Sequence, residues 1–263
     1  MNQILYGRNP VYECLRAARR NVSGIQIAQG SREKGVLAQL VKLARSRGIA
    51  VQRVDRRRLD KLSRGAVHQG VIAKVGEYPY AGVDEIFALA RQRDEPPWLL
   101  LLDCLQDPQN LGTLLRTAEI VGLHGVIIPD RRAAAVTPAV VSASSGASEH
   151  LLVAQITNLV RTMRDLKTRE VWIVGLENAP GAQPLWRADL SAALGLVVGN
   201  EGSGIRRLVK ETCDFVIRLP MVGRIGSLNA SVAGSVALYE IARQRGIGHI
   251  DKDVRLTYNV KQS

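Results

Sequence analysis

The sequence has few aromatic residues and little cysteine. Only 4% of its 263 residues are aromatic, and none form an interleaved pattern with basic residues. This argues against an RNA-binding domain that stacks bases on aromatic side chains. The three cysteines, Cys14, Cys104 and Cys213, are far apart and match no metal-ligand spacing, and the four histidines form no cluster. We therefore expect no metal site, cysteines that pack in the core, and a reducing, cytoplasmic setting.

Long hydrophobic runs and several common motifs are also missing. No apolar run approaches membrane-spanning length, and the first residues show no basic-then-apolar signal, so we expect no membrane association. The glycines at 199, 202 and 204 do not have the G-x-G-x-x-G spacing, and the sequence contains neither GK[ST] nor G-x-S-x-G. These absences argue against a nicotinamide oxidoreductase, a P-loop enzyme and a serine hydrolase.

The chain instead carries a large excess of positive charge. Its net charge is +12, with 36 Lys and Arg against 24 Asp and Glu. Residues 1–95 hold 18 of the basic and 9 of the acidic residues, so most of the excess lies in that part. This predicts a polyanionic partner, nucleic acid before acidic lipid, which meets the N-terminal part first.

Residues 1–75 alternate short helices and strands. Helical patterns cover 11–18 and 35–47, strands are expected at 25–28 and 49–54, and a loop at 65–70 feeds a further strand. The alternation predicts a small α/β domain. A linker is expected at 76–97, where one helix at 83–91 precedes a breaker at Pro96 and Pro97.

Residues 98–263 are expected to form a second α/β domain around a mostly parallel sheet. The run at 98–102 is fully apolar, as expected of a strand buried on both faces. Asn110 is predicted to cap the helix that follows this strand. The polar tail after Gly246 is expected to be poorly ordered. The remaining strands are expected at 126–128, 151–154, 171–176, 194–198 and 215–219, with helices between them.

Three polar loops stand out in this second domain, at 107–116, 199–204 and 227–229. The buried strands at 194–198 and 215–219 each end in a polar loop that contains glycine, and ligands of open α/β sheets bind just beyond the carboxyl ends of the strands. From spacing alone, this predicts an α/β domain that binds a ligand, with a basic appendage that faces RNA.

The three loops resemble the three motifs of the SpoU (TrmH-type) RNA ribose 2'-O-methyltransferases. The motifs read Asp107-Pro108-x-Asn110-x-Gly112-x-x-x-Arg116, Gly199-Asn200-Glu201-Gly202-x-Gly204, and Leu219-Pro220-Met221 followed by Ser227-Leu228-Asn229-Ala230-Ser231. YGRNPVYECL near the N-terminus and His68-Gln69-Gly70-Val71 match as well, so the resemblance covers nearly the whole chain. The nearest branch is that of the bacterial 23S rRNA guanosine 2'-O-methyltransferases.

This resemblance implies a fold and a reaction. It implies a catalytic domain with a deep trefoil knot at 98–263, which binds S-adenosylmethionine in a bent shape and forms a homodimer. It also implies an L30e-like RNA-binding domain at 1–75. The small residues of the last helix (Ala230, Ala233, Gly234 and Ala237) permit close packing and are candidates for the dimer interface.

The resemblance also assigns candidate residues. Gly199, Leu219 and Leu228 match positions whose backbone holds the cofactor; otherwise they are ordinary strand-end and core residues. Arg116 matches the essential arginine, and arginine is a poor base because a guanidinium keeps its proton in proteins. We therefore expect Arg116 to anchor a phosphate of the target and to stabilise the developing alkoxide, with a phosphate oxygen or water taking the proton. The alternatives are that Arg116 is itself the base, or only a solvated helix residue.

Four polar residues complete the candidate site. Asn110 and Glu201 are expected to orient Arg116 or the ribose, and Ser227 and Asn229 to contact the ribose or the cofactor carboxylate. The alternative for each is a role at a helix start, as a cap or as a favourable acid.

The sequence thus predicts a methyltransferase that acts on 23S rRNA. The alternatives are a tRNA 2'-O-methyltransferase and, in another class, a non-catalytic RNA-binding or ribosome-assembly module. Departures from the branch pattern at Asn200, Arg224 and Gly226 leave the modified nucleotide open.

Overall fold

The computed structural model describes residues 3–247, so nearly all of the tail expected to be poorly ordered lies outside the described residues. The first 75 residues form a four-stranded sheet in the order β1-β4-β2-β3. Strand β4 pairs antiparallel with β1 and β2, and β2 pairs parallel with β3. The strands are β1 (Gln3–Tyr6), β2 (Val22–Ala28), β3 (Val51–Val54) and β4 (Val71–Val75), and the helices are α1 (Arg8–Ala17), α2 (Val36–Ser46) and α3 (Arg56–Leu62).

The segment at 76–97 contains helix α4 (Val83–Gln92). Its buried residues Ile86 and Phe87 belong to a hydrophobic cluster with strands of the second sheet. Just before the helix, the Ala81 amide donates to the Val153 carbonyl oxygen at 2.9 Å. The helix predicted at 83–91 is confirmed, and it packs as part of the second layered unit.

The second sheet has seven strands in the order β7-β6-β5-β10-β8-β11-β9, and every pair is parallel. This confirms the predicted α/β class with a mostly parallel sheet; the trefoil knot stays a prediction. The strands are β5 (Trp98–Leu102), β6 (Gly125–Pro129), β7 (Val153–Ile156), β8 (Trp172–Leu176), β9 (Gln183–Pro184), β10 (Leu194–Val198) and β11 (Phe215–Arg218). The helices are α5 (Pro108–Ile120), α6 (Pro138–Ala143), α7 (Leu159–Lys167), α8 (Arg207–Thr212) and α9 (Ala230–Gln244), with short 3-10 turns η1 (Ala147–Glu149) and η2 (Leu185–Arg187).

Helices cover both faces of this sheet, which explains its continuous apolar strands. Successive residues of a strand point to opposite faces. Leu100 and Leu102 of β5 pack in the cluster that includes α5 and α9, whereas Leu99 and Leu101 pack in the cluster that includes α4, α7 and α8. The loops that follow the strands therefore lie at the edge of the sheet, between the helices of one face and those of the other.

Helices α5 and α9 pack closely through the small residues of α9. A Cβ on Gly234 would lie 2.6 Å from Leu114 Cδ2 of α5, and Ala237 is fully buried. Gly234 and Ala237 thus serve packing inside one chain, so the expectation that they form a dimer interface is wrong for these two. The outer face of α9 instead carries Val232, Val236 and Tyr239.

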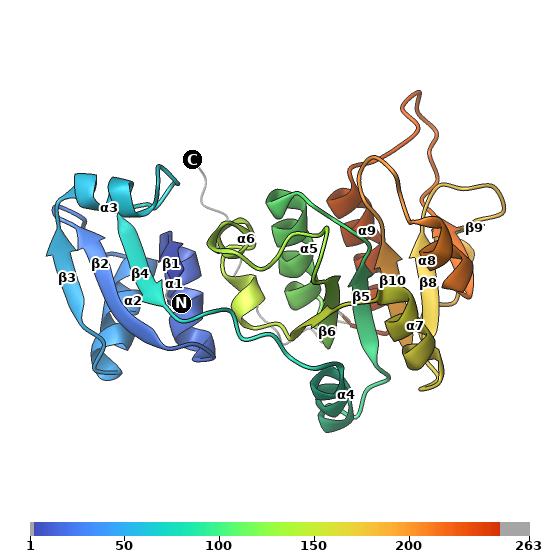
Figure 1. The fold of residues 1–263 in the computed structure, drawn as a ribbon, viewed down its shortest axis with the longest axis horizontal. Helices are drawn as coiled ribbons and strands as arrows, with labels where there is room; N and C mark the ends of the chain where they lie inside the picture. The colour runs from blue at the N-terminus through green and yellow to red at the C-terminus, as the bar shows by residue number, and fades with distance from the viewer. Residues whose placement is uncertain (1–2, 248–263) are drawn as a thin grey trace.

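A buried ion pair joins the part of the molecule that contains the first sheet to the part that contains the second sheet. Arg20, after α1, pairs with Glu149 of η1, and their side chains are 0% and 1% exposed. Figure 1 shows α6 lying between the first sheet and α5, and it contacts both β1 and α5. Within residues 3–247, no helix combines the length and apolar composition needed to cross a membrane.

Candidate active site

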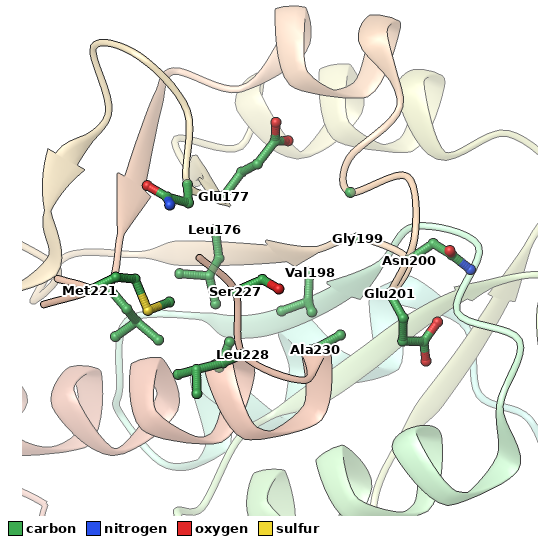
Figure 2. Close-up of a pocket in the computed structure, with 14 residues that line it drawn as sticks. Leu176, Glu177, Val198, Gly199, Asn200, Glu201, Met221, Ser227, Leu228 and Ala230 are labelled. Carbon is green, nitrogen blue, oxygen red and sulfur yellow. The ribbon is translucent and has the colours of Figure 1, made fainter. Parts of the chain in front are cut away.

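The candidate site lies where the parallel strands β10, β8 and β11 end. A cavity of about 230 Å³ opens there between the loops that follow these strands and the first turns of α9. Figure 2 shows Leu176 and Val198 facing Leu228 and Ala230 across it. Its lining residues are Leu176, Glu177, Asn178, Val198, Gly199, Asn200, Glu201, Gly204, Leu219, Met221, Ser227, Leu228, Ala230 and Ala233.

The structure brings five of the eight predicted site residues to this cavity. They are the three predicted cofactor-binding residues, Gly199, Leu219 and Leu228, together with Glu201 and Ser227. Leu219 is buried, whereas Leu228 is 46% exposed at the rim. Parallel strands end at one edge of a sheet, so loops distant in sequence meet there.

The turn after β10 requires glycine at its first position. The Asn200 and Gly204 backbones bond to each other in both directions, at 3.0 and 2.9 Å, which folds the turn back on itself. A Cβ on Gly199 would lie 2.3 Å from the Gly204 carbonyl carbon. Asn200, a departure from the branch pattern, holds the turn as well: its side chain donates to the Cys104 carbonyl oxygen at 3.1 Å and accepts from the Gly202 amide at 3.0 Å.

A polar network next to the cavity joins the other predicted residues. Asn110 Nδ2 donates to the Glu201 carboxylate, and Asn229 Nδ2 donates to Asn110 Oδ1 at 3.0 Å. The Ser231 hydroxyl lies 3.0 Å from Asn110 Oδ1 and 2.6 Å from Asn229 Oδ1. Asn110 is 8% exposed, so these contacts fix both the position and the orientation of its amide.

The prediction that Asn110 caps α5 is wrong. The helix begins at Pro108, and Asp107 is its N-cap, accepting from the Gln109 amide at 3.0 Å. Proline suits this first position because it lacks the amide that a helix start would leave without a partner. Asn110 therefore lies within the first turn, and its side chain is free for the network. Asn229, in contrast, is a cap: its Oδ1 accepts from the Ser231 and Val232 amides at 2.9 and 3.2 Å.

Arg116 lies away from the network within one chain. Its guanidinium donates to Ser145 Oγ at 3.3 Å, and it contacts neither Glu201 nor Asn229. Six residues separate it from Asn110 along α5, which turns its side chain to another face of the helix. It shares an exposed face with Thr113 and Ile120.

Sequence reasoning missed several polar residues of the site. Ser231 was part of the third motif but was not assigned a role, and Glu177 and Asn178 follow β8. Glu177 accepts from the Ile205 amide at 3.3 Å and pairs with Lys210 at 2.8 Å, and Asn178 Nδ2 donates to the Gly226 carbonyl oxygen at 3.3 Å. An acid and an amide directly after a buried strand were the available signal.

The charge of the cavity is opposite to that of the protein. The lining contains two carboxylates, Glu177 and Glu201, and no lysine, arginine or histidine. Lys210 neutralises Glu177 from outside the lining. In a chain of net charge +12, this cavity suits a ligand with an apolar part and a positive charge, and it disfavours a polyanion.

We expect Gly199→Ala to abolish ligand binding in this cavity. The added Cβ cannot coexist with the Gly204 backbone, so the turn must open and displace Glu201. Gly202→Ala is the matched control, because its Cβ would meet only Asn200 Oδ1, at 3.7 Å. Calorimetric titration with S-adenosylmethionine should show affinity reduced at least about 100-fold for the first variant and nearly unchanged for the second. Equal affinities would mean that the turn does not shape the site.

Comparison with known proteins decides the family. The family described as SpoU rRNA Methylase matches residues 97–239, more than half of the chain. The chain belongs to the SpoU rRNA methylase family. Residues 4–81 of this SpoU methylase match a second family, described as RNA 2'-O ribose methyltransferase substrate binding. The family predicted from the three motifs is therefore confirmed.

Related proteins agree with this assignment. A Bacillus subtilis protein named as a TrmH family tRNA/rRNA methyltransferase is 45% identical over 239 residues, which are 91% of this chain and 94% of that protein. A tRNA/rRNA methyltransferase from Mycobacterium sp. (strain KMS) is 42% identical over 92% of this chain and 77% of its own. The SpoU methyltransferase AviRb from Streptomyces viridochromogenes, solved in complex with AdoMet, has the same fold with a TM-score of 0.76 at 24% identity, over 94% of this chain and 92% of AviRb.

The SpoU methylase is thus an RNA 2'-O-methyltransferase, which confirms the predicted enzyme class. Across the described part of the chain, no three His, Cys, Asp or Glu side chains gather as a metal ion would require. Burial raises the pKa of the Cys104 thiol, so this half-buried cysteine beside the site stays protonated at neutral pH.

Proposed function

We propose that this SpoU methylase transfers a methyl group from S-adenosylmethionine to the ribose 2'-hydroxyl of a guanosine in 23S rRNA. The observation that carries the proposal is a cavity without cationic side chains, at the carboxyl edge of the sheet, in a strongly basic protein. The RNA is a polyanion and the methyl donor is a cation. The molecule therefore offers separate surfaces of opposite character for the two substrates.

The residues of the cavity fit S-adenosylmethionine. Leu176, Val198 and Leu219 offer apolar walls for an adenine, and Glu201 places a negative charge in the lining. Backbone groups of the strand-end loops at Gly199 and Leu228 can recognise adenine edges and the methionine part without special side chains. The bound cofactor supplies a sulfonium-activated methyl group, the electrophile of the reaction.

The acceptor is a ribose hydroxyl, which must lose its proton as the new bond forms. We assign to Arg116 the binding of a phosphate next to that ribose and the stabilisation of the developing alkoxide, because a guanidinium is too weak a base to take the proton. A phosphate oxygen or a water takes the proton. Asn110, Asn229 and Ser227 orient the ribose and the cofactor, with Glu201 held in place by the Asn110 amide.

The active protein is a homodimer in this proposal. Val232, Val236 and Tyr239 of α9 and Ile120 of α5 form an exposed apolar face, here called the α5/α9 face. Leu228, which is exposed at the rim of the cavity, lies four residues before Val232, and Arg116 lies on α5 four residues before Ile120. A second copy bound to this face brings its Arg116 to the first copy's cavity, which accounts for the separation of Arg116 from the network within one chain.

Val236→Glu should disrupt this dimer. A carboxylate in the centre of an apolar interface loses its hydration, so we expect a shift toward monomer in light scattering and loss of methyl transfer. Trp186→Glu is a suitable control, because Trp186 is 55% exposed on η2, outside the α5/α9 face and outside the lining of the cavity. A wild-type protein that is monomeric at micromolar concentration would contradict the dimer.

The N-terminal domain, residues 1–75, binds the RNA in an L30e-like manner in this proposal. Its excess positive charge and the match to a substrate-binding family support this role. The relatives' names include tRNA as well as rRNA, so tRNA is the second candidate substrate.

Methyl transfer to purified RNAs tests the proposed substrate. The protein is incubated with labelled S-adenosylmethionine and either unmodified 23S rRNA or unmodified tRNA, and methylated riboses are mapped as sites resistant to alkaline cleavage. A single methylated guanosine in 23S rRNA supports the proposal. Methylation of tRNA alone favours the second candidate, and cofactor binding without transfer to either RNA rejects both.

A further inference from the structure

A second and larger cavity lies on the opposite helical layer from the cofactor cavity. It has a volume of about 880 Å³ and runs between the loop after β6, the start of α7 and the start of α8. We call it the arginine groove. Its lining includes six arginines and a single acidic residue, Asp165; the arginines are Arg131, Arg132, Arg161, Arg164, Arg206 and Arg207.

This concentration of arginine is specific to the groove. Residues 96–263 contain 18 Lys and Arg against 15 Asp and Glu, so a third of their basic residues line this one cavity. All six arginines are exposed. Charges of one sign on three different elements repel one another, so such a cluster is stabilised when an anion binds.

Four of the six guanidinium groups have no partner in the part of the chain that the structure describes. Among residues 3–247, the side chains of Arg131, Arg132, Arg161 and Arg164 make no hydrogen bond or ion pair. Arg161 and Arg164 are three residues apart on α7, so both project from the same face of that helix into the groove. Their fork-shaped donors match phosphate oxygens.

The other two arginines are held in place. Arg206 is fixed by the buried carboxylate of Asp103, which accepts from its Nε at 2.7 Å and from its backbone amide at 2.8 Å. The same carboxylate raises the pKa of Arg206. Arg207 pairs with Glu211 at 2.8 Å. After these pairs and Asp165 are counted, the groove still has an excess of positive charge.

The linings of the groove and of the cofactor cavity are connected along the chain. The turn that lines the cofactor cavity at Asn200 continues directly into Arg206 of the groove. Cys104 lines the groove, and its carbonyl oxygen accepts from the Asn200 side chain. The two cavities are therefore linked through the turn at residues 200–206 and through the contact between Asn200 and Cys104.

We infer that the arginine groove binds the phosphate backbone of the substrate RNA next to the target nucleotide. The inference rests on the RNA methyltransferase activity of the family but not on which RNA is methylated. The groove gives the catalytic domain an RNA surface of its own, in addition to the basic N-terminal domain. Its contacts read charge rather than base sequence, so it positions the strand while other parts choose the nucleotide.

The double variant Arg161→Gln/Arg164→Gln tests the inference without touching the cofactor cavity. Binding of labelled 23S rRNA fragments and of tRNA is measured by fluorescence anisotropy at several salt concentrations. We expect the dissociation constant to rise about tenfold or more at low salt, and the slope of log K against log salt to fall by about one to two. S-adenosylmethionine affinity and thermal unfolding should match those of the wild type.

The double variant Arg91→Gln/Arg187→Gln is the matched control. It removes the same net charge from exposed positions on α4 and η2, outside the groove. If it weakens RNA binding as much as the groove variant, the effect is one of overall charge and the inference is overturned. Unchanged RNA binding in the groove variant overturns it too, as does a loss confined to anionic lipid vesicles. The readout is binding, so a wild type that methylates neither RNA rejects the proposed substrate while leaving this test intact.

Discussion

Replacing Arg116 with alanine is expected to lower kcat for RNA methylation at least about 100-fold, with cofactor affinity changed by less than about twofold. The residue lies outside the cavity of its own chain, and within residues 3–247 its side chain makes a single hydrogen bond, a long one to Ser145. Its loss should therefore leave the fold and the cavity intact. Single-turnover methyl transfer with saturating RNA, together with calorimetric titration of S-adenosylmethionine, measures both quantities.

If the protein is the proposed homodimer, mixed dimers test in which subunit Arg116 acts. Arg116→Ala subunits have an intact cavity, and Gly199→Ala subunits have an intact Arg116. If each site combines the cavity of one subunit with Arg116 of the other, random mixing of these two inactive proteins should restore about one quarter of wild-type activity. If Arg116 acts within its own chain, mixing restores nothing.

Lysine at position 116 separates the chemical roles of this residue. Lysine keeps the charge but loses the planar fork that binds a phosphate through two hydrogen bonds. We expect Arg116→Lys to remain far below wild-type turnover. Near-full turnover with lysine would overturn the two-point phosphate contact and would favour a simple charge effect.

The second large effect is expected on stability. Arg20→Ala should lower the free energy of unfolding by about 3–5 kcal/mol, because it leaves the carboxylate of Glu149 buried without its partner. Arg20 also donates to Gln3 Oε1 at 3.0 Å, and its guanidinium lies 4.9 Å from the Tyr78 ring centroid. Urea unfolding followed by circular dichroism measures the change.

Two further variants show that the loss comes from the buried pair. Arg16→Ala removes an arginine of α1 that pairs with Glu13 at 3.0 Å on the surface. Because surface ion pairs contribute little, its effect on the free energy of unfolding should be small. Arg20→Met combined with Glu149→Leu removes both charges and should recover much of the lost stability. If Arg20→Ala unfolds like the wild type, the pair does not hold the two halves of the molecule together.

The position of the cavity at the ends of β8, β10 and β11 could be predicted because it follows from a general rule. The buried runs at 194–198 and 215–219 end in polar loops, and parallel strands place such loops at one edge. Gly199, Leu219 and Leu228 were identified from the motifs, and all three line the cavity. The sequence is sufficient to predict this position because every open parallel sheet places the loops that follow its strands at the same edge.

The roles of individual polar side chains could not be predicted in the same way. Asn110 fits a cap by its sequence context, but Asp107 and Pro108 start the helix earlier and place Asn110 in the network. The contacts of Ser231 and Asn178 could not be predicted either, since they are to residues 121 and 48 positions away. A side-chain hydrogen bond depends on distances of a few ångströms, which the spacing of a sequence does not contain.

The sequence by itself determined the alternation of helices and buried strands, the charge imbalance and the three motif loops, because periodicity and composition are local properties. Only the tertiary structure decided that Arg116 points away from its own cavity and that six arginines from three elements meet in one groove. Those arginines are spread over residues 131–207, and only the packing of α7 and α8 beside the end of β6 brings their charges together.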